Sequence, residues 1–219
     1  MGSPNVISAL TTAPARFLIG RWPWLALIYL LFSGVVGLAL LVLLPYTLLL
    51  LPLWGILIGM LERRRTSLLG FSRQSSGHVR VDAVERHHWL SIRITERATW
   101  REVLALVLDL VMGIGAVFIV FFEFIGIAVL VGAAATGLDG PREMQFIGPL
   151  RAVMTPQNWW VTIPIGLVWL CILAYLNAVY AGVQAAALRR LCGPRQQELA
   201  QTVRALIRSR RSLAEAAEA

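Results

Sequence analysis

The sequence has 219 residues, of which 58% are hydrophobic and only 15% are charged, and its mean hydropathy is +0.70. Soluble domains carry about a quarter charged residues, so this composition excludes an ordinary water-soluble globular protein. The net charge of +8 does not indicate nucleic-acid binding, because all twenty basic residues are arginines placed between long apolar stretches. Arginine near the ends of membrane spans is retained on the cytoplasmic side, which explains the excess without a polyanionic partner.

The first apolar stretch, residues 24–61, contains no charge and is about twice as long as one membrane-spanning helix requires. It predicts two spans joined by a tight turn between Gly37 and Thr47, where Pro45 and Pro52 end or bend the helices. A second span that starts after Pro45 has only about sixteen residues before the next charge, so a re-entrant or membrane-thinning segment is the alternative.

The second apolar stretch, residues 103–137, predicts a single long helix, because no turn signal interrupts its middle and its cytoplasmic end can extend past the hydrocarbon. The third stretch opens with Trp159 and Trp160, an aromatic pair suited to the headgroup region, and continues to about Leu188. The chain is therefore predicted to be an all-α polytopic membrane protein with four transmembrane helices.

The arginines orient these spans. Two precede the first span, nine lie in 62–102, two in 137–158 and seven in 189–219. With both termini and the 62–102 connection in the cytoplasm, eighteen arginines lie inside the cell membrane and two outside, as the positive-inside rule requires. The predicted organisation is an interfacial or flexible N-terminal segment (1–23), a four-span domain (24–190) with a cytoplasmic connection (62–102) and an outer loop (137–158), and a cytoplasmic helix (191–219).

The cytoplasmic connection contains three histidines, His78, His87 and His88. Adjacent histidines alone do not make a tetrahedral metal site, and no cysteine or carboxylate pattern completes one, so no metal or other cofactor is predicted. We expect the arginines and histidines of residues 78–100 to face water or anionic headgroups, while Trp89 and Trp100 lie against lipid or the spans.

The C-terminal segment, residues 195–219, is strongly helix-forming and has no further proline or glycine. Its apolar side chains fall on one heptad seam, in which Arg210 occupies the missing position: Leu199, Val203, Leu206 and Leu213. This spacing predicts a two-stranded helix between two copies of the chain. The alternative is a single amphipathic helix that lies on the membrane.

Two acids lie inside the predicted spans, and the cost of such groups in lipid makes them functional candidates. Asp109 is expected near the inner headgroups, where solvation or Arg101 can satisfy it. Glu123 lies deeper, so it must be protonated, paired or exposed to a wet pocket, with Asn177, Tyr175 or Tyr180 on the last span as polar neighbours.

Two sequence motifs resemble a known membrane module. One is Ala98-Thr99-Trp100-Arg101-Glu102-Val103-Leu104, which leads into an apolar span, and the other is Leu191-Cys192-Gly193-Pro194 before the helical tail. On these motifs the chain resembles the actinobacterial "putative sensor" domain over roughly residues 14–219. The resemblance implies a four-span input unit ahead of the dimerisation and ATP-binding parts of sensor histidine kinases, although Asp109 stands where relatives often have a basic or apolar residue.

The sequence itself contains no catalytic triad order, phosphate-binding glycine loop, dinucleotide motif, His-Asp phosphoacceptor motif or nucleotide-binding region. We therefore expect no enzymatic activity from this chain. The hypothesis is a homodimeric sensor in the lipid bilayer that signals to a downstream kinase domain or response regulator. The competing hypothesis is a non-catalytic subunit or partner of a transporter or other membrane complex.

Overall fold

The computed structural model describes residues 5–72, 78, 93–139, 141–147, 150–193 and 207. Its helices are α1 (Val6–Leu10), α2 (Pro14–Ile19), α3 (Trp22–Leu43), α4 (Leu51–Arg65), α6 (Arg97–Asp139) and α7 (Thr162–Cys192). Short 3₁₀ turns are η1 (Leu48–Leu50), η2 (Thr66–Leu69) and η4 (Trp159–Val161), and the strands are β1 (Arg142–Ile147) and β2 (Leu150–Met154). The predicted helical architecture is confirmed in its main helices, and α3, α6 and α7 are each long and apolar enough to cross a bilayer, which is consistent with a membrane protein.

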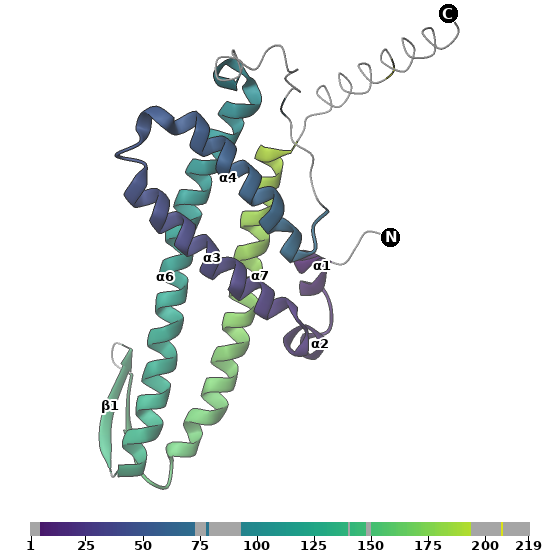
Figure 1. The fold of residues 1–219 in the computed structure, drawn as a ribbon. Coiled ribbons are helices and arrows are strands. Elements are labelled where there is room, and N and C mark those ends of the chain that lie inside the picture. Colours follow the sequence, from purple (N-terminus) through teal and green to yellow (C-terminus); the bar gives the residue numbers. More distant parts are fainter. Residues whose placement is uncertain are drawn as a thin grey trace, which may run out of the picture.

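Helices α6 and α7 form the frame of the molecule and run side by side along its length (Figure 1). The sequence between Arg97 and Asp139 contains no proline, and α6 is one continuous helix of 43 residues, as predicted. At a rise of 1.5 Å per residue it measures about 65 Å, roughly twice the thickness of the hydrocarbon core. Helix α7 ends at Gly193, whose backbone is extended and which precedes Pro194.

Helices α3 and α4 form a hairpin that crosses α6 and α7 obliquely (Figure 1). Its turn follows Leu43 and contains Pro45, within the interval predicted for it. Pro52 lies in the first turn of α4, where the missing N–H has no intrahelical partner to lose. Helix α4 has only 15 residues, about 22 Å. Three helices of the described chain, not four, therefore reach the length of a full span.

Glycines allow the hairpin to approach α6 closely. A Cβ atom on Gly37 of α3 would lie 2.7 Å from the Cα of Gly113 in α6. In α4, Gly55 and Gly59 lie four residues apart, and a Cβ on Gly55 would lie 2.9 Å from the side chain of Val103. Lipid tails are as apolar as the helices, so association depends on such close van der Waals packing of small residues.

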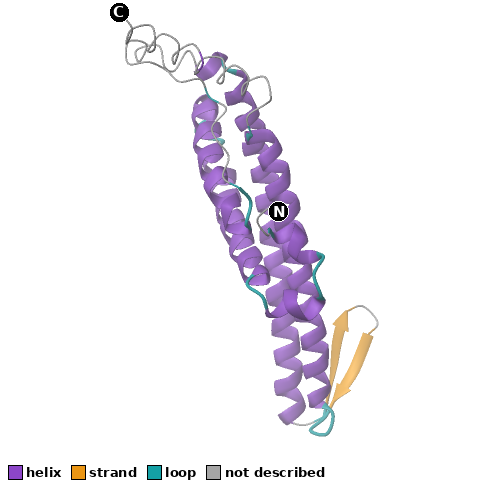
Figure 2. Cartoon of the chain, turned by 90° about the vertical axis from the view of Figure 1, so that its right-hand side faces the viewer, coloured by secondary structure: helices purple, strands orange, loops and turns teal. Residues whose placement is uncertain are grey.

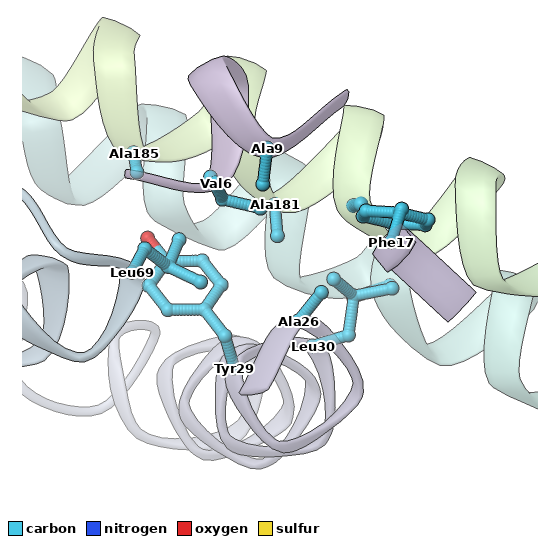
Figure 3. Packing of buried hydrophobic residues seen from close by; sticks show 11 residues of the cluster. Val6, Ala9, Phe17, Ala26, Tyr29, Leu30, Leu69, Ala181 and Ala185 are labelled. Carbon is cyan, nitrogen blue, oxygen red and sulfur yellow. The ribbon is translucent and has the colours of Figure 1, made fainter. Parts of the chain in front are cut away.

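The described part of the N-terminal segment, for which an interfacial or flexible lead-in was predicted over residues 1–23, forms the two short helices α1 and α2. Helix α1 is closed by a capping box, in which Asn5 and Ser8 exchange side-chain to backbone hydrogen bonds of 2.9 Å. The ring of Phe17 in α2 lies 4.6 Å from that of Tyr175 in α7. Figure 3 shows side chains of α1, α2, α3, η2 and α7 that meet in one cluster: Val6, Ala9, Phe17, Ala26, Tyr29, Leu30, Leu69, Ala181 and Ala185. Two short helices therefore complete the core beside α7.

The 137–158 connection, predicted as a loop, contains the two strands. β1 and β2 pair antiparallel, with Arg142 opposite Met154 and an irregularity between Gln145 and Ile147. This hairpin lies beside the end of α6 where α3 and α4 are absent, so the molecule narrows there to α6, α7 and the hairpin (Figure 2). It is the exception to the predicted all-α fold among the described residues.

The α3–α6 crossing generates a stability prediction. We expect Gly113→Ala to lower the free energy of unfolding by about 1–3 kcal/mol, because the added Cβ would lie 2.6 Å from the carbonyl oxygen of Ser33. Gly132→Ala in the same helix is the control, since its Cβ would meet nothing within 4 Å. Unfolding in mixed micelles measures both variants. Equal effects of the two substitutions would contradict close packing at the crossing.

Candidate functional site

Arg65, the last residue of α4, is buried inside the helix bundle and is 4% exposed. Its Nη2 atom lies 2.7 Å from Oε1 of Glu62 and 2.9 Å from Oδ1 of Asp109. The guanidinium also lies 4.4 Å from the ring centroid of Tyr29, whose hydroxyl is 3.4 Å from Nη2. One cation is thus held by two carboxylates and an aromatic face, away from water.

Gln184 extends this group of polar side chains to the one remaining long helix, α7. Its amide donates to Oδ1 of Asp109 at 2.9 Å and to Oγ of Ser33 at 2.5 Å. We call the whole group the Arg65 cluster: Tyr29, Ser33, Glu62, Arg65, Asp109 and Gln184. The cluster joins α3, α4, α6 and α7 at one point, so none of these helices can shift without changing a buried polar contact.

A second group of ion pairs lies beside it, at the start of α6. Glu102 accepts from Arg63 at 2.5 Å and lies 2.8 Å from Nε2 of His78. The other ring nitrogen of His78 lies 2.8 Å from Glu96, which also pairs with Arg93 at 2.7 Å. We call these five residues the Glu102 cluster.

The two clusters place acidic and basic side chains in direct contact. Among the described residues they contain four carboxylates, on Glu62, Glu96, Glu102 and Asp109, and three guanidinium groups. Burial disfavours the charged form of His78, but its interactions with Glu102 and Glu96 outweigh burial and raise its pKa above the usual 6.5. The imidazolium adds a positive charge beside these two carboxylates.

These contacts locate the arginines at the end of α4 and correct one expectation from the sequence. Arg63 and Arg65 are 9% and 4% exposed, whereas the intervening Arg64 is exposed. Asp109 pairs with Arg65, not with Arg101, which donates to the carbonyl of Gly193 at 3.3 Å. The reason is the oblique course of α4, which carries its C-terminal end into the bundle.

Glu123 lies between α6 and α7, in the half of α6 nearer the β-hairpin, and is 7% exposed. Its carboxylate is hydrogen-bonded to the side chain of Asn177, so the structure brings these two predicted site residues together. Tyr175 points to Phe17 instead. Oε1 of Glu123, Oδ1 of Asn177 and Nε1 of Trp169 are buried and have no hydrogen-bond partner among the described residues. This second polar contact therefore joins only α6 and α7.

The remaining predicted residues cannot be placed. The seam residues Leu199, Val203, Leu206 and Leu213, and two of the histidines, lie outside the described residues. Within the described part of the chain, no group of three histidine, cysteine or acidic residues could hold a metal ion. Gln184 was not predicted from the sequence, although it is one of two side-chain amides, with Asn177, inside the last apolar span.

The Arg65 cluster predicts a large loss of stability when its cation is removed. Arg65→Gln leaves Glu62 and Asp109 without their cation, and breaking a buried ion pair costs about 3–5 kcal/mol. The free energy of unfolding in mixed micelles measures the effect. The exposed Arg64 provides the control, because Arg64→Gln removes the same charge without a buried contact. Addition of Asp109→Asn to Arg65→Gln should recover part of the loss, and no recovery would contradict the pairing.

His78 predicts that stability depends on pH. Its pKa is raised in the folded chain, so its contribution is fully present below the unfolded value of 6.5 and is lost as pH rises through the folded value. As pH rises from 6.5 through the folded value, the unfolding temperature should fall, and His78→Gln should flatten that part of the profile. A profile unchanged by His78→Gln would show that another group causes the dependence.

Comparison with known proteins is consistent with a membrane module of this size. A family model described as "Putative sensor" matches residues 15–191. This range includes every member of the Arg65 and Glu102 clusters, together with Glu123 and Asn177. No curated protein and no solved structure matches the chain.

Proposed function

Because the chain belongs to the Putative sensor family, we propose that it is the membrane input domain of a two-component histidine kinase. In this role it passes a membrane or envelope stimulus to the helix that follows α7. The observation that supports the proposal most directly is the Arg65 cluster, in which contacts from α3, α4, α6 and α7 converge. A sensor needs such a point, because a change in one helix must alter the others.

The cluster favours a switch between discrete packings. Movement of the α3–α4 hairpin displaces Arg65 relative to Asp109, and a buried ion pair cannot be stretched gradually without a large cost. Gln184 donates a hydrogen bond to the same carboxylate, that of Asp109. It lies eight residues before Cys192, the last residue of α7, and therefore about 12 Å from the end of the helix. A rotation or shift of α7 then changes the position of the segment that follows it.

The proposed topology has four spans, with both termini on the cytoplasmic side of the cell membrane. The arginine distribution supports this orientation. The short helix α4 is the second span, and together with η1 the segment 48–65 measures about 27 Å. That length is close to the ~30 Å of hydrocarbon. Burial of Arg63 and Arg65 in protein removes the need for α4 to carry their charges as far as the headgroups.

The proposed stimulus acts in or close to the membrane. The 137–158 connection is short, and between α6 and η4 its described residues include only the β1–β2 hairpin as regular structure, which favours a lipid, an envelope-active compound or membrane tension over a large extracellular ligand. Such a stimulus must interact with the two packings differently in order to shift their populations.

We further propose that two copies associate through the spans and the tail, and that a downstream kinase domain or response regulator receives the signal. Disulfide cross-linking in membranes tests this, in a background where Cys171 and Cys192 are replaced by serine. Single cysteines at Leu199, Val203 and Leu206 should cross-link strongly, because a heptad seam brings these positions together with their copies. Cysteines at Gln201 and Ala205, off the seam, are the controls.

The same assay tests coupling to the Arg65 cluster. Asp109→Asn keeps the shape of the side chain but removes its charge, so it should change cross-linking at the three seam positions and leave the controls low. Equal cross-linking yields at the seam and control positions would contradict the proposed dimer. If the chain were then recovered with other membrane proteins, the result would favour a non-catalytic subunit of a larger complex. A periodic profile that is insensitive to Asp109→Asn in folded protein would contradict coupling.

A further inference from the structure

An apolar groove of about 330 Å³ lies between α1 and the C-terminal half of α7. One wall comes from α1 and the other from one face of α7, where small residues leave room, and an arginine lies at one end. The residues that line the groove include Ile7, Leu10, Gly182, Ala186, Ala187 and Arg190. The groove lies outside both the Arg65 cluster and the Glu123–Asn177 contact. The α7 residues that line the groove before Arg190 are all aliphatic or glycine.

Arg190 is not paired in the way that several arginines of the bundle are. Arg63 and Arg65 are paired with buried carboxylates, and Arg189 donates to the carbonyl of Ser72 at 2.5 Å. The side chain of Arg190 is exposed, and no hydrogen bond or ion pair satisfies it within the described residues. It lies in the last turn of α7, so its guanidinium is at the level where the apolar span meets a membrane surface.

We propose that this groove binds one anionic phospholipid, with an acyl chain along α7 between Ile7 and Ala186 and the phosphate on Arg190. The ligand class follows from charge and shape together. A planar guanidinium can bind two phosphate oxygens at once, and an apolar groove that starts beside it matches a molecule with a chain attached to its charge. This inference requires only that α7 crosses the bilayer with its arginine end at a membrane surface.

The short helix α1 determines whether the groove exists. Gly182 faces α1, and a Cβ at this position would lie 3.3 Å from the side chain of Ile7. The capping box of Asn5 and Ser8 closes the first turn of α1 and helps to keep Ile7 in place. A lipid bound here contacts α1 and α7 together and therefore stabilises their docking.

Native mass spectrometry of the purified full chain tests the proposal. Phosphatidylglycerol and phosphatidylcholine with identical acyl chains are titrated separately. We expect one phosphatidylglycerol to bind more tightly than any phosphatidylcholine, and Arg190→Gln to weaken that one binding event about fivefold. Arg64→Gln is the matched control, because Arg64 is exposed on the last turn of α4 and lies outside the groove.

A second variant tests the acyl chain separately from the charge. Ala186→Phe fills the groove, keeps every arginine and should abolish the tight site, whereas inorganic phosphate should not compete with the lipid. Arg190→Gln changes an exposed side chain and leaves the core intact, so the test does not depend on folding of Ala186→Phe. Equal effects of Arg190→Gln and Arg64→Gln, no effect of Ala186→Phe, or displacement by phosphate alone would each overturn the proposal.

The same measurement reveals other occupants of the groove. If Ala186→Phe or Arg190→Gln dissociated a dimer that forms without phosphatidylglycerol, a second copy of the chain would occupy the groove and the lipid proposal would be overturned. Lipid binding is measured without reference to tail cross-linking. Absence of lipid binding would therefore overturn the lipid proposal without contradicting the proposed sensor function, which the cross-linking experiment tests.

Discussion

Charged groups inside an apolar bundle must be paired, and this requirement determines how the helices of this protein are arranged. Arg65 can be buried because Glu62 and Asp109 lie within 3 Å of its Nη2 atom. Asp109 in turn tolerates the interior because Arg65 and Gln184 share one of its oxygens. The four helices that supply these groups can meet only where glycines permit close approach. The packing of small residues and the pairing of charges are thus parts of the same arrangement.

The polar contacts divide the molecule along its length. At the end of the bundle where α4 terminates, two adjoining clusters connect the hairpin, the start of α6 and the last turns of α7. Toward the β-hairpin, the Glu123–Asn177 hydrogen bond holds only α6 to α7. Because fewer polar contacts hold the half near the β-hairpin, that half can change its packing more easily than the half that contains the Arg65 and Glu102 clusters. This division suits a domain that receives a stimulus at one level of the membrane and transmits it at another.

Hydrophobic length and proline placement were sufficient to predict α6, α7 and the turn after α3. They were not sufficient for α4, because a count of apolar residues does not show how steeply a helix crosses its neighbours. The burial of Arg63 and Arg65 depends on that angle, so their ion pairs could not be predicted from the sequence. The pairing of Glu123 with Asn177 followed from two polar residues in apolar spans. The role of Gln184 did not, because its partners come from helices that are distant in sequence.

The unbroken course of α6 gives the molecule a mechanical property. Its closest approach to α3 is at Gly113, which is about 24 Å from Arg97 and about 39 Å from Asp139 along the helix. If the glycine contact acts as a pivot, the helix is a lever with unequal arms, and the long arm carries the β-hairpin. A large displacement produced by a small force at the β-hairpin then becomes a smaller displacement with a larger force at Glu102 and its neighbours.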